Sequence, residues 1–239
     1  MEDVDATGIE NLDDPTLISI GTTLNNIVHS QLLGNISKNL ILELLTSMEA
    51  PEELKDIVIE SNLEEIDFAE LLVDLKQAVE AISATIDELN AAINNGFTQE
   101  NISNILDALK DVTIPASVLD VVKGELDKAI ADVAESVKTE ANAIVAVADI
   151  ILANTIIHSA DTEASIKQET LENLQSTMTD VLTNIVASQT MQDVMMGYEI
   201  DVHQNIQTMI STTINNPETN FTTEQQEAIA HFFKLEIGA

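Results

Sequence analysis

The feature that most constrains this chain is a long run of apolar residues spaced alternately four and three positions apart. The run begins at Phe68 and keeps its spacing as far as Ile93. A repeat of 3.5 residues places all of its members on one face of an α-helix, as in coiled coils and helical bundles. We therefore predict a helix-association seam, within the chain or between subunits, formed by Phe68, Leu72, Leu75, Val79, Ile82, Ile86, Leu89 and Ile93.

The composition agrees with a protein built from packed helices. Apolar residues make up 45% of the 239-residue chain but aromatic residues only 3%, so the core must be built from aliphatic side chains and Met. With 7 Gly and 4 Pro there are few of the tight turns that a many-stranded sheet needs. Residues beside the seam widen its apolar face beyond that of a two-stranded coil. We predict an all-α fold, an elongated multi-helix bundle with heptad-patterned long helices and short connecting helices.

Local helix signals divide the chain into an arm and two helical domains. Residues 1–13 have no sustained apolar period and are expected to form a flexible acidic N-terminal arm. We assign residues 14–112 to an N-terminal helical domain and residues 113–239 to a C-terminal long-helix domain. Asp14 followed by Pro15 is typical of an N-cap and the first residue of a helix, so we expect a helix to begin there.

One short phrase occurs twice, and we interpret each copy as the end of one helix and the start of the next. The chain reads INNGFTQE from residue 93 and INNPETNFTTE from residue 214. Paired asparagines, with the Gly or Pro that follows them, interrupt a helix. Thr98 is then expected to cap the next helix after the first copy. Thr222 or Thr223 is expected to cap a final helix after the second copy.

An apolar period also runs through residues 161–215, which predicts either one long helix or several shorter ones. Ser188, Gln192 and Glu199 occupy polar positions on this otherwise apolar seam, and Gly197 could kink it. A polar residue on an apolar seam can fix the alignment of two helices at a cost in stability. We therefore interpret Ser188, Gln192 and Glu199 as register or partner-contact positions.

The charge balance limits the partners that the protein can bind directly. The chain has 42 acidic and 9 basic residues, for a formal net charge of −33, and all the basic residues are Lys. Nucleic-acid phosphates are bound chiefly by clusters of Lys and Arg, so no direct binding of nucleic acid is expected. The expected partners are the chain itself, as a homo-oligomer, or other proteins of an assembly, including basic protein surfaces.

The sequence also bears on location. The N-terminus, MEDVDATGIENLDD, lacks the basic and apolar regions of a secretory signal, so we expect a cytoplasmic protein or one incorporated into a particle assembled there. The most apolar stretch, Ala143–Ile157, is shorter than a bilayer span and contains Asp149. We expect it to form a buried helix and predict no membrane span.

No motif in the sequence predicts catalysis or a cofactor. The chain has no Cys, and its four His occur in no HExxH or Glu-x-x-His pattern. Glu199 and His203 would lie four residues apart on one helical face, but two ligands are too few for a metal site. We therefore expect a non-enzymatic protein with no catalytic residues, no cofactor and no metal.

Three functions remain open. The first is a structural or assembly subunit that associates through helices, for instance as a component of a virus or phage virion. The second is an acidic binding module or nucleic-acid mimic whose carboxylates occupy a basic cleft of a partner. The third is a helical pore-forming protein in which Ala143–Ile157 moves from a buried position into a membrane. The seam and the polar positions of the long tract favour the first.

Overall fold

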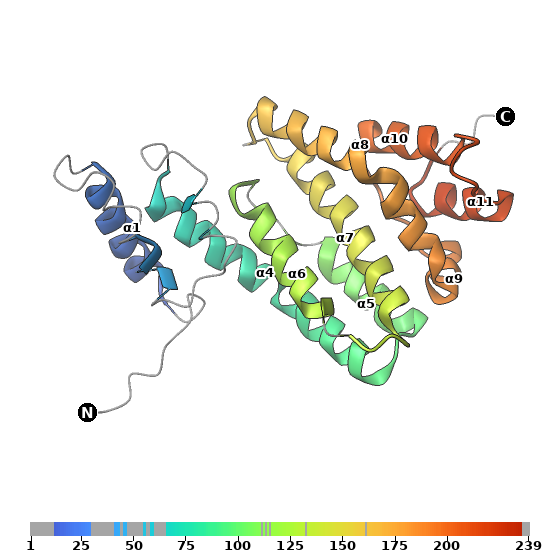
Figure 1. Cartoon of the computed structure of the whole chain (residues 1–239), viewed down its shortest axis with the longest axis horizontal. Coiled ribbons are helices and arrows are strands. Elements are labelled where there is room, and N and C mark those ends of the chain that lie inside the picture. Colours follow the sequence, from blue (N-terminus) through green and yellow to red (C-terminus); the bar gives the residue numbers. More distant parts are fainter. Residues whose placement is uncertain are drawn as a thin grey trace. The chain divides into compact units, whose positions relative to one another are not determined.

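The structure is a computed structural model that describes residues 12–29, 41–43, 45–46, 55, 58–59, 66–110, 112, 114, 116–131, 133–160 and 162–235. Every regular element named among these residues is helical, which confirms the predicted all-α, multi-helix fold (Figure 1). The elements are α1 (Asp14–His29), α4 (Phe68–Asn95), α5 (Gln99–Lys110), the 3₁₀ turn η3 (Ala116–Val118), α6 (Leu119–Ala131), α7 (Lys138–His158), α8 (Ala164–Ala187), α9 (Gln189–Gly197), α10 (Gln204–Ile214) and α11 (Thr223–Phe232).

The chain divides into two compact units. One consists of residues 1–81 with residues 117–124, and the other of residues 82–116 with residues 125–239. Helix α4 contributes to both, because its residues up to Ala81 belong to the first unit and the remainder to the second. Most of the predicted N-terminal arm lies outside the described residues, and the domain boundary predicted after residue 112 stays a prediction.

In the first unit, α1 approaches the start of α4 closely. A Cβ atom added at Gly21 of α1 would lie 2.3 Å from the Cα atom of Ala69. Only glycine fits at such a distance, so Gly21 sets the spacing of the two helices. The buried apolar side chains of this unit include Leu17, Leu24, Ile41, Leu45, Val58, Phe68, Leu72 and Leu75.

The first turn of α1 is capped one residue earlier than predicted. Oδ1 of Asp13 accepts a hydrogen bond of 2.9 Å from the backbone N–H of Thr16, so Asp13 is the N-cap. Asp14 is then the first helical residue and Pro15 the second. Because Pro15 has no N–H, the cap bonds to Thr16 alone. Hydrogen bonds from the side chain and the backbone N–H of Thr16 lower the pKa of Asp13.

Helix α4 begins with a cap that involves two segments of the chain. Oδ1 of Asp67 accepts from the backbone N–H of Ala69 at 3.0 Å. Asn25 of α1 donates to the same carboxylate at 2.9 Å and accepts from the backbone N–H of Phe68 at 2.9 Å. The hydrogen bond from Asn25 is the main cause of the lowered pKa of Asp67. The start of α4 is therefore fixed by α1 as well as by its own cap.

In the second unit, α7 is the central helix. Helices α5, α8 and α9 all pack against it (Figure 1). Among the described residues it is the one helix long and apolar enough to cross a membrane, and 67% of its most apolar window is buried in the structure. A helix that packs against neighbours on several sides needs no polar face, which accounts for this composition. Helix α7 contains the whole apolar stretch Ala143–Ile157 noted in the sequence and extends beyond it at both ends.

The first copy of the repeated phrase ends one helix and begins another, as predicted. Helix α4 ends at Asn95, and Gly96 adopts a positive φ of 91°, a conformation that favours glycine. Thr98 and Asn101 then exchange two hydrogen bonds. Oγ1 of Thr98 accepts at 3.3 Å from the N–H of Asn101, and Oδ1 of Asn101 accepts at 2.8 Å from the N–H of Thr98. This pair caps α5.

The second copy works in the same way. Helix α10 ends at Ile214, and Thr222 is the N-cap of α11. Thr222 and Gln225 form a reciprocal capping box, with hydrogen bonds of 3.2 and 3.0 Å. Hydrogen bonds from its own backbone N–H and from Thr222 lower the pKa of Glu224 in the first turn. Of the two predicted caps, Thr222 is therefore the one used.

The tract of residues 161–215 is not one straight helix. It contains α8, α9 and α10, with a break at Ser188 and a second break between Gly197 and Gln204. Ser188 has an extended backbone, with φ −95° and ψ 126°. Gly197 is the last residue of α9 and does not kink a longer helix.

Candidate functional site

The seam residues predicted on α4 are mostly buried where the structure describes their side chains. The ones with 0% exposure are Phe68, Leu72, Leu75, Ile82 and Leu89. Ile86 and Ile93 are half-buried, and the side chain of Val79 lies outside the described part of the structure. Most of the described seam is therefore packed inside the chain itself.

The buried face of α4 also includes the row of residues beside the seam. Leu71, Ala78, Thr85 and Ala92 are each at most 7% exposed. In the second half of the helix this row is better buried than Ile86. The two halves of α4 belong to different units. A role for the seam in contact with another subunit stays a prediction.

Ser188, interpreted as a register or partner-contact position, has two partners within the chain. Its side chain is 2% exposed. The hydroxyl accepts at 3.1 Å from the backbone N–H of Met191 and donates at 3.2 Å to Oε1 of Glu140. Ser188 thus caps α9 and bonds to a residue of α7, which explains a polar residue at a buried position.

The other two polar positions of the tract also have partners within the chain. Nε2 of Gln192 donates at 2.7 Å to the backbone oxygen of Val186, in the last turn of α8. Glu199 is exposed, and its carboxylate lies 3.7 Å from Nζ of Lys234 and 3.9 Å from Nδ1 of His231. Any further contact of these residues with a partner stays a prediction.

Glu199 and His203 do not share a helical face, so the prediction that both lie on one helix is wrong. Both lie between α9 and α10, because the helix from which the spacing was inferred is interrupted there. His203 is the N-cap of α10, and its Nδ1 accepts at 3.1 Å from the backbone N–H of Asn205. Within the described residues, no group of three or more His, Asp or Glu side chains could hold a metal ion.

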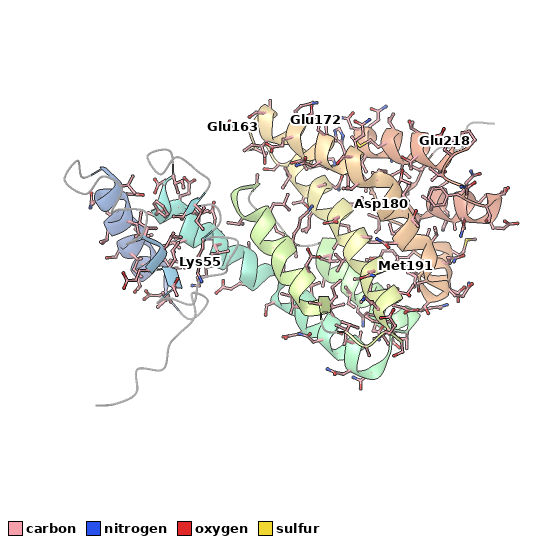
Figure 2. All side chains as sticks on the ribbon, viewed as in Figure 1. Lys55, Glu163, Glu172, Asp180, Met191 and Glu218 are labelled. Atoms are coloured by element: carbon pink, nitrogen blue, oxygen red, sulfur yellow. The ribbon has the colours of Figure 1, made fainter. Side chains whose placement is uncertain are left out.

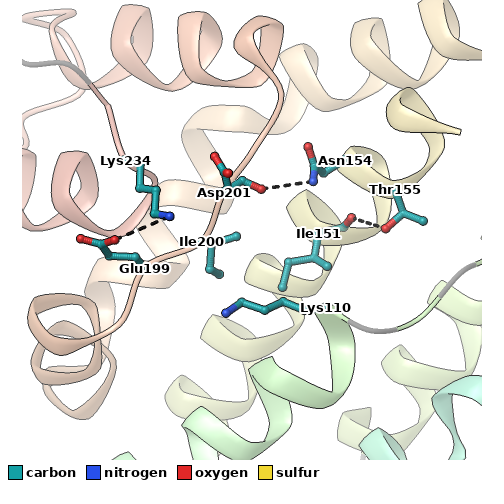
Figure 3. Close-up of a pocket in the computed structure, with 8 residues that line it drawn as sticks. All are labelled: Lys110, Ile151, Asn154, Thr155, Glu199, Ile200, Asp201 and Lys234. Carbon is teal, nitrogen blue, oxygen red and sulfur yellow. Dashed lines mark hydrogen bonds and ion pairs between the residues drawn. The ribbon is translucent and has the colours of Figure 1, made fainter.

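A cavity of about 330 Å³ lies in the second unit, between the last turns of α7 and the segment that precedes α10 (Figure 3). Its lining combines two Lys, two acidic residues, two Ile and two neutral polar residues. The lining residues are Lys110, Ile151, Asn154, Thr155, Glu199, Ile200, Asp201 and Lys234. This cavity is one candidate binding site within the described residues.

Hydrogen bonds to backbone groups hold the wall of this cavity in place. Asn154 of α7 donates at 3.3 Å to the backbone oxygen of Asp201 and accepts at 2.7 Å from the backbone N–H of His203. The N–H of Ile200 donates at 2.6 Å to the backbone oxygen of Phe232 in α11. Asn154 therefore attaches the segment before α10 to α7, and Ile200 attaches it to α11.

The two lysines of the cavity already lie near carboxylates. Nζ of Lys234 is 3.7 Å from Oε2 of Glu199. Nζ of Lys110 is 3.6 Å from Oδ1 of Asp107 and 4.2 Å from the ring centroid of Tyr198, a cation–π distance. The hydroxyl of Tyr198 donates at 2.5 Å to the same carboxylate oxygen. These contacts suit a junction between helices better than a site for an anionic ligand, which would compete with both carboxylates.

Sequence reasoning missed Asn154 and Tyr198. Asn154 is 47 residues from Asp201, and Tyr198 is 91 residues from Asp107. No local motif connects residues so far apart. The one available signal was that Tyr198 is the single Tyr of the chain.

A second candidate is a surface with little charge on α8 and α10. Only four of the 45 residues from Asn173 to Pro217 are charged, whereas charged residues make up 21% of the whole chain. Helix α10 contains no Asp, Glu or Lys. Glu163 precedes α8 and Glu172 lies in its first half, whereas Asp180 is the one charged residue of its second half (Figure 2). The exposed polar residues here include Ser176, Thr179, Thr183, Asn184, Gln204, Asn205, Thr208 and Thr212.

Comparisons of the chain with protein-family models, with curated proteins and with solved structures found no match. Its function must therefore be inferred from its fold and its surface chemistry. Charge is unevenly distributed over the helices, with only four charged residues from Asn173 to Pro217.

Proposed function

We propose that the protein is a non-enzymatic structural or assembly subunit that associates with other proteins through its helices. The observation that carries this proposal is the uneven distribution of charge. In a chain of net charge −33, residues 173–217 form an extended region with hardly any charge. Strongly acidic chains repel one another, so contact is least unfavourable where charge is lowest. A large particle, such as a virion, is one setting for a subunit of this kind.

The polar groups of the second unit support a structural role. Ser188, Gln192 and Asn154 all bond to backbone or side-chain groups of neighbouring segments. These polar side chains thus connect neighbouring segments of this unit. Such a scaffold presents fixed helical surfaces to a partner.

The absolute mass of the purified chain tests the proposal. Light scattering after size exclusion would be recorded at about 0.01 M and about 0.15 M salt, where charges are screened over about 30 Å and about 8 Å. We expect a defined oligomer whose share rises at the higher salt, because screening weakens the repulsion between acidic copies. A monomer at both salt concentrations would contradict self-assembly.

A second candidate function, binding to a basic protein cleft, is favoured by the first half of α8. Glu163, Glu169 and Glu172 are exposed within ten residues, beside Lys167. Carboxylates spaced along a helix would attract a basic surface. A monomeric chain that binds a Lys-rich peptide, and binds it more weakly as salt increases, would support this alternative.

The pore-forming alternative would require a large rearrangement. Helix α7 would have to leave the centre of the second unit, where α5, α8 and α9 pack against it. A vesicle-leakage assay tests this idea. Release of a trapped dye would support it.

A further inference from the structure

We infer that the second half of α8 together with α10 forms a docking surface for the same surface of a second copy of this chain. This inference rests on the proposed function, which it extends by naming the surface and the partner. We define the hydroxyl surface by five exposed residues, Ser176, Thr179 and Thr183 of α8 and Thr208 and Thr212 of α10. The two helices pack against one another and lie along the same side of the second unit (Figure 1).

Hydrogen bonding within the helices lowers the cost of removing four of the five hydroxyls from water, those of Ser176, Thr183, Thr208 and Thr212. The hydroxyl of Thr183 donates at 2.7 Å to the backbone oxygen of Thr179, and that of Thr212 donates at 2.8 Å to the backbone oxygen of Thr208. Ser176 and Thr208 donate in the same way to carbonyls of the preceding turn, at 2.7 and 2.9 Å. A buried donor without an acceptor is unfavourable, but these donors are already bonded.

The spacing of the threonines adds a regular pattern. Thr179 and Thr183 are four residues apart, as are Thr208 and Thr212, so each pair stacks on one helical face. With its hydroxyl turned to its own helix, each bonded Thr can offer its methyl group for packing. Small β-branched side chains also lose little conformational freedom when they are buried. Such a surface can pack closely against another helix.

Electrostatics favours a second copy as the partner over a basic protein. Every copy carries a net charge of −33, so most pairings of two surfaces bring carboxylates together. Pairing the hydroxyl surface with itself brings few carboxylates together, and it satisfies the symmetry of a two-fold dimer. A basic partner would gain more from the acid-rich first half of α8 than from this surface.

Asp180 provides a specific test, because it is the one charged residue between Asn173 and Ala187. In a symmetric dimer, Asp180 of both copies would lie in or beside the interface. Replacing it with Asn removes that repulsion and preserves the size of the side chain. Asp180→Asn should therefore tighten the dimer about three- to tenfold at low salt, and by less at moderate salt.

Adding charge to the surface should have the opposite effect. The double variant Thr183→Glu with Thr212→Glu places two new carboxylates on the hydroxyl surface of each copy. The matched control, Asn90→Glu with Gln99→Glu, adds the same charge at exposed positions of α4 and α5. Sedimentation equilibrium of the full chain should show association weakened at least about tenfold for the double variant, with the control much less affected. Circular dichroism verifies that each variant is folded.

The possible outcomes separate the inference from the proposed function. Loss of association in the surface variant alone, with tightening by Asp180→Asn, supports the hydroxyl surface. A wild-type oligomer that the two double variants weaken equally would overturn this surface while the assembly function stands. A dimer weakened by Asp180→Asn would also overturn it. A wild-type monomer under all conditions would overturn both.

Discussion

The close approach of α1 to α4 at Gly21 allows a quantitative prediction. A Cβ atom there would lie 2.3 Å from Cα of Ala69, 2.4 Å from its backbone nitrogen and 2.5 Å from the carbonyl carbon of Phe68. These are backbone atoms, which cannot rotate away as a flexible side chain could. In Gly21→Ala, α1 would have to move by about 1 Å to restore ordinary contact, in an interior packed as densely as a crystal. Leu17 and Leu24, both buried on α1, would lose contacts as a result.

Two opposing effects determine the size of the change. Replacing Gly with Ala within a helix normally stabilises it by about 1 kcal/mol. Overpacking a rigid contact costs about 1–3 kcal/mol, and backbone neighbours place Gly21 at the upper end. We therefore expect Gly21→Ala to lower the free energy of unfolding of the first unit by about 2 kcal/mol.

Urea denaturation followed by circular dichroism would measure this change, and amide hydrogen exchange would locate it in α1. Gly197→Ala is the matched control, because Gly197 is the last residue of α9 and a Cβ there has no atom within 4 Å. The control should be neutral or slightly stabilising. If Gly21→Ala were as stable as the wild type, with unchanged exchange in α1, the inferred close contact would be refuted.

Three further predictions concern single side chains. The lowered pKa of Asp67 means that its contribution to stability is complete above its usual pKa of 3.8 and is lost as the pH falls through the folded value. The wild type should therefore melt at a higher temperature than Asp67→Asn at about pH 5, and this difference should decrease as the pH is lowered to about 3. Among the described residues the buried Thr85 hydroxyl has no hydrogen-bond partner, so Thr85→Val should stabilise the chain by about 1 kcal/mol in urea denaturation, whereas a loss would indicate that the hydroxyl is bonded. Thr222→Ala should destabilise α11 by about 1 kcal/mol and speed its amide exchange, and Thr222→Asp, which preserves a cap, should restore most of the loss.

The parts of the fold that the sequence predicts are those fixed by local chemistry. The helix boundaries at both copies of the repeated phrase depend on residues three positions apart, Thr98 with Asn101 and Thr222 with Gln225. The all-α class follows from a composition that supplies few turns. Both inferences need only neighbouring residues or overall content, and the structure confirms both.

The parts that could not be predicted depend on contacts between distant segments. Asn25 helps to cap α4 from 42 residues away, and Asn154 holds the segment that precedes α10. An Asn in either place has no distinguishing neighbours in the sequence. The cap at Asp13 was missed for a different reason. Pro is typical of the first helical position, which favoured Asp14 as the cap, whereas Pro15 is the second helical residue here.

The polar positions of residues 161–215 show how one sequence pattern supports two physical explanations. A polar residue on an apolar seam can align two helices, but it can also bond to the free backbone groups at a helix break. Ser188 and Gln192 do the latter, since one caps α9 and the other bonds to the last turn of α8. Their polarity is therefore accounted for within the chain. Partner contacts are better sought among exposed side chains whose hydroxyl donors are bonded within their own helix, as for Thr183 and Thr212.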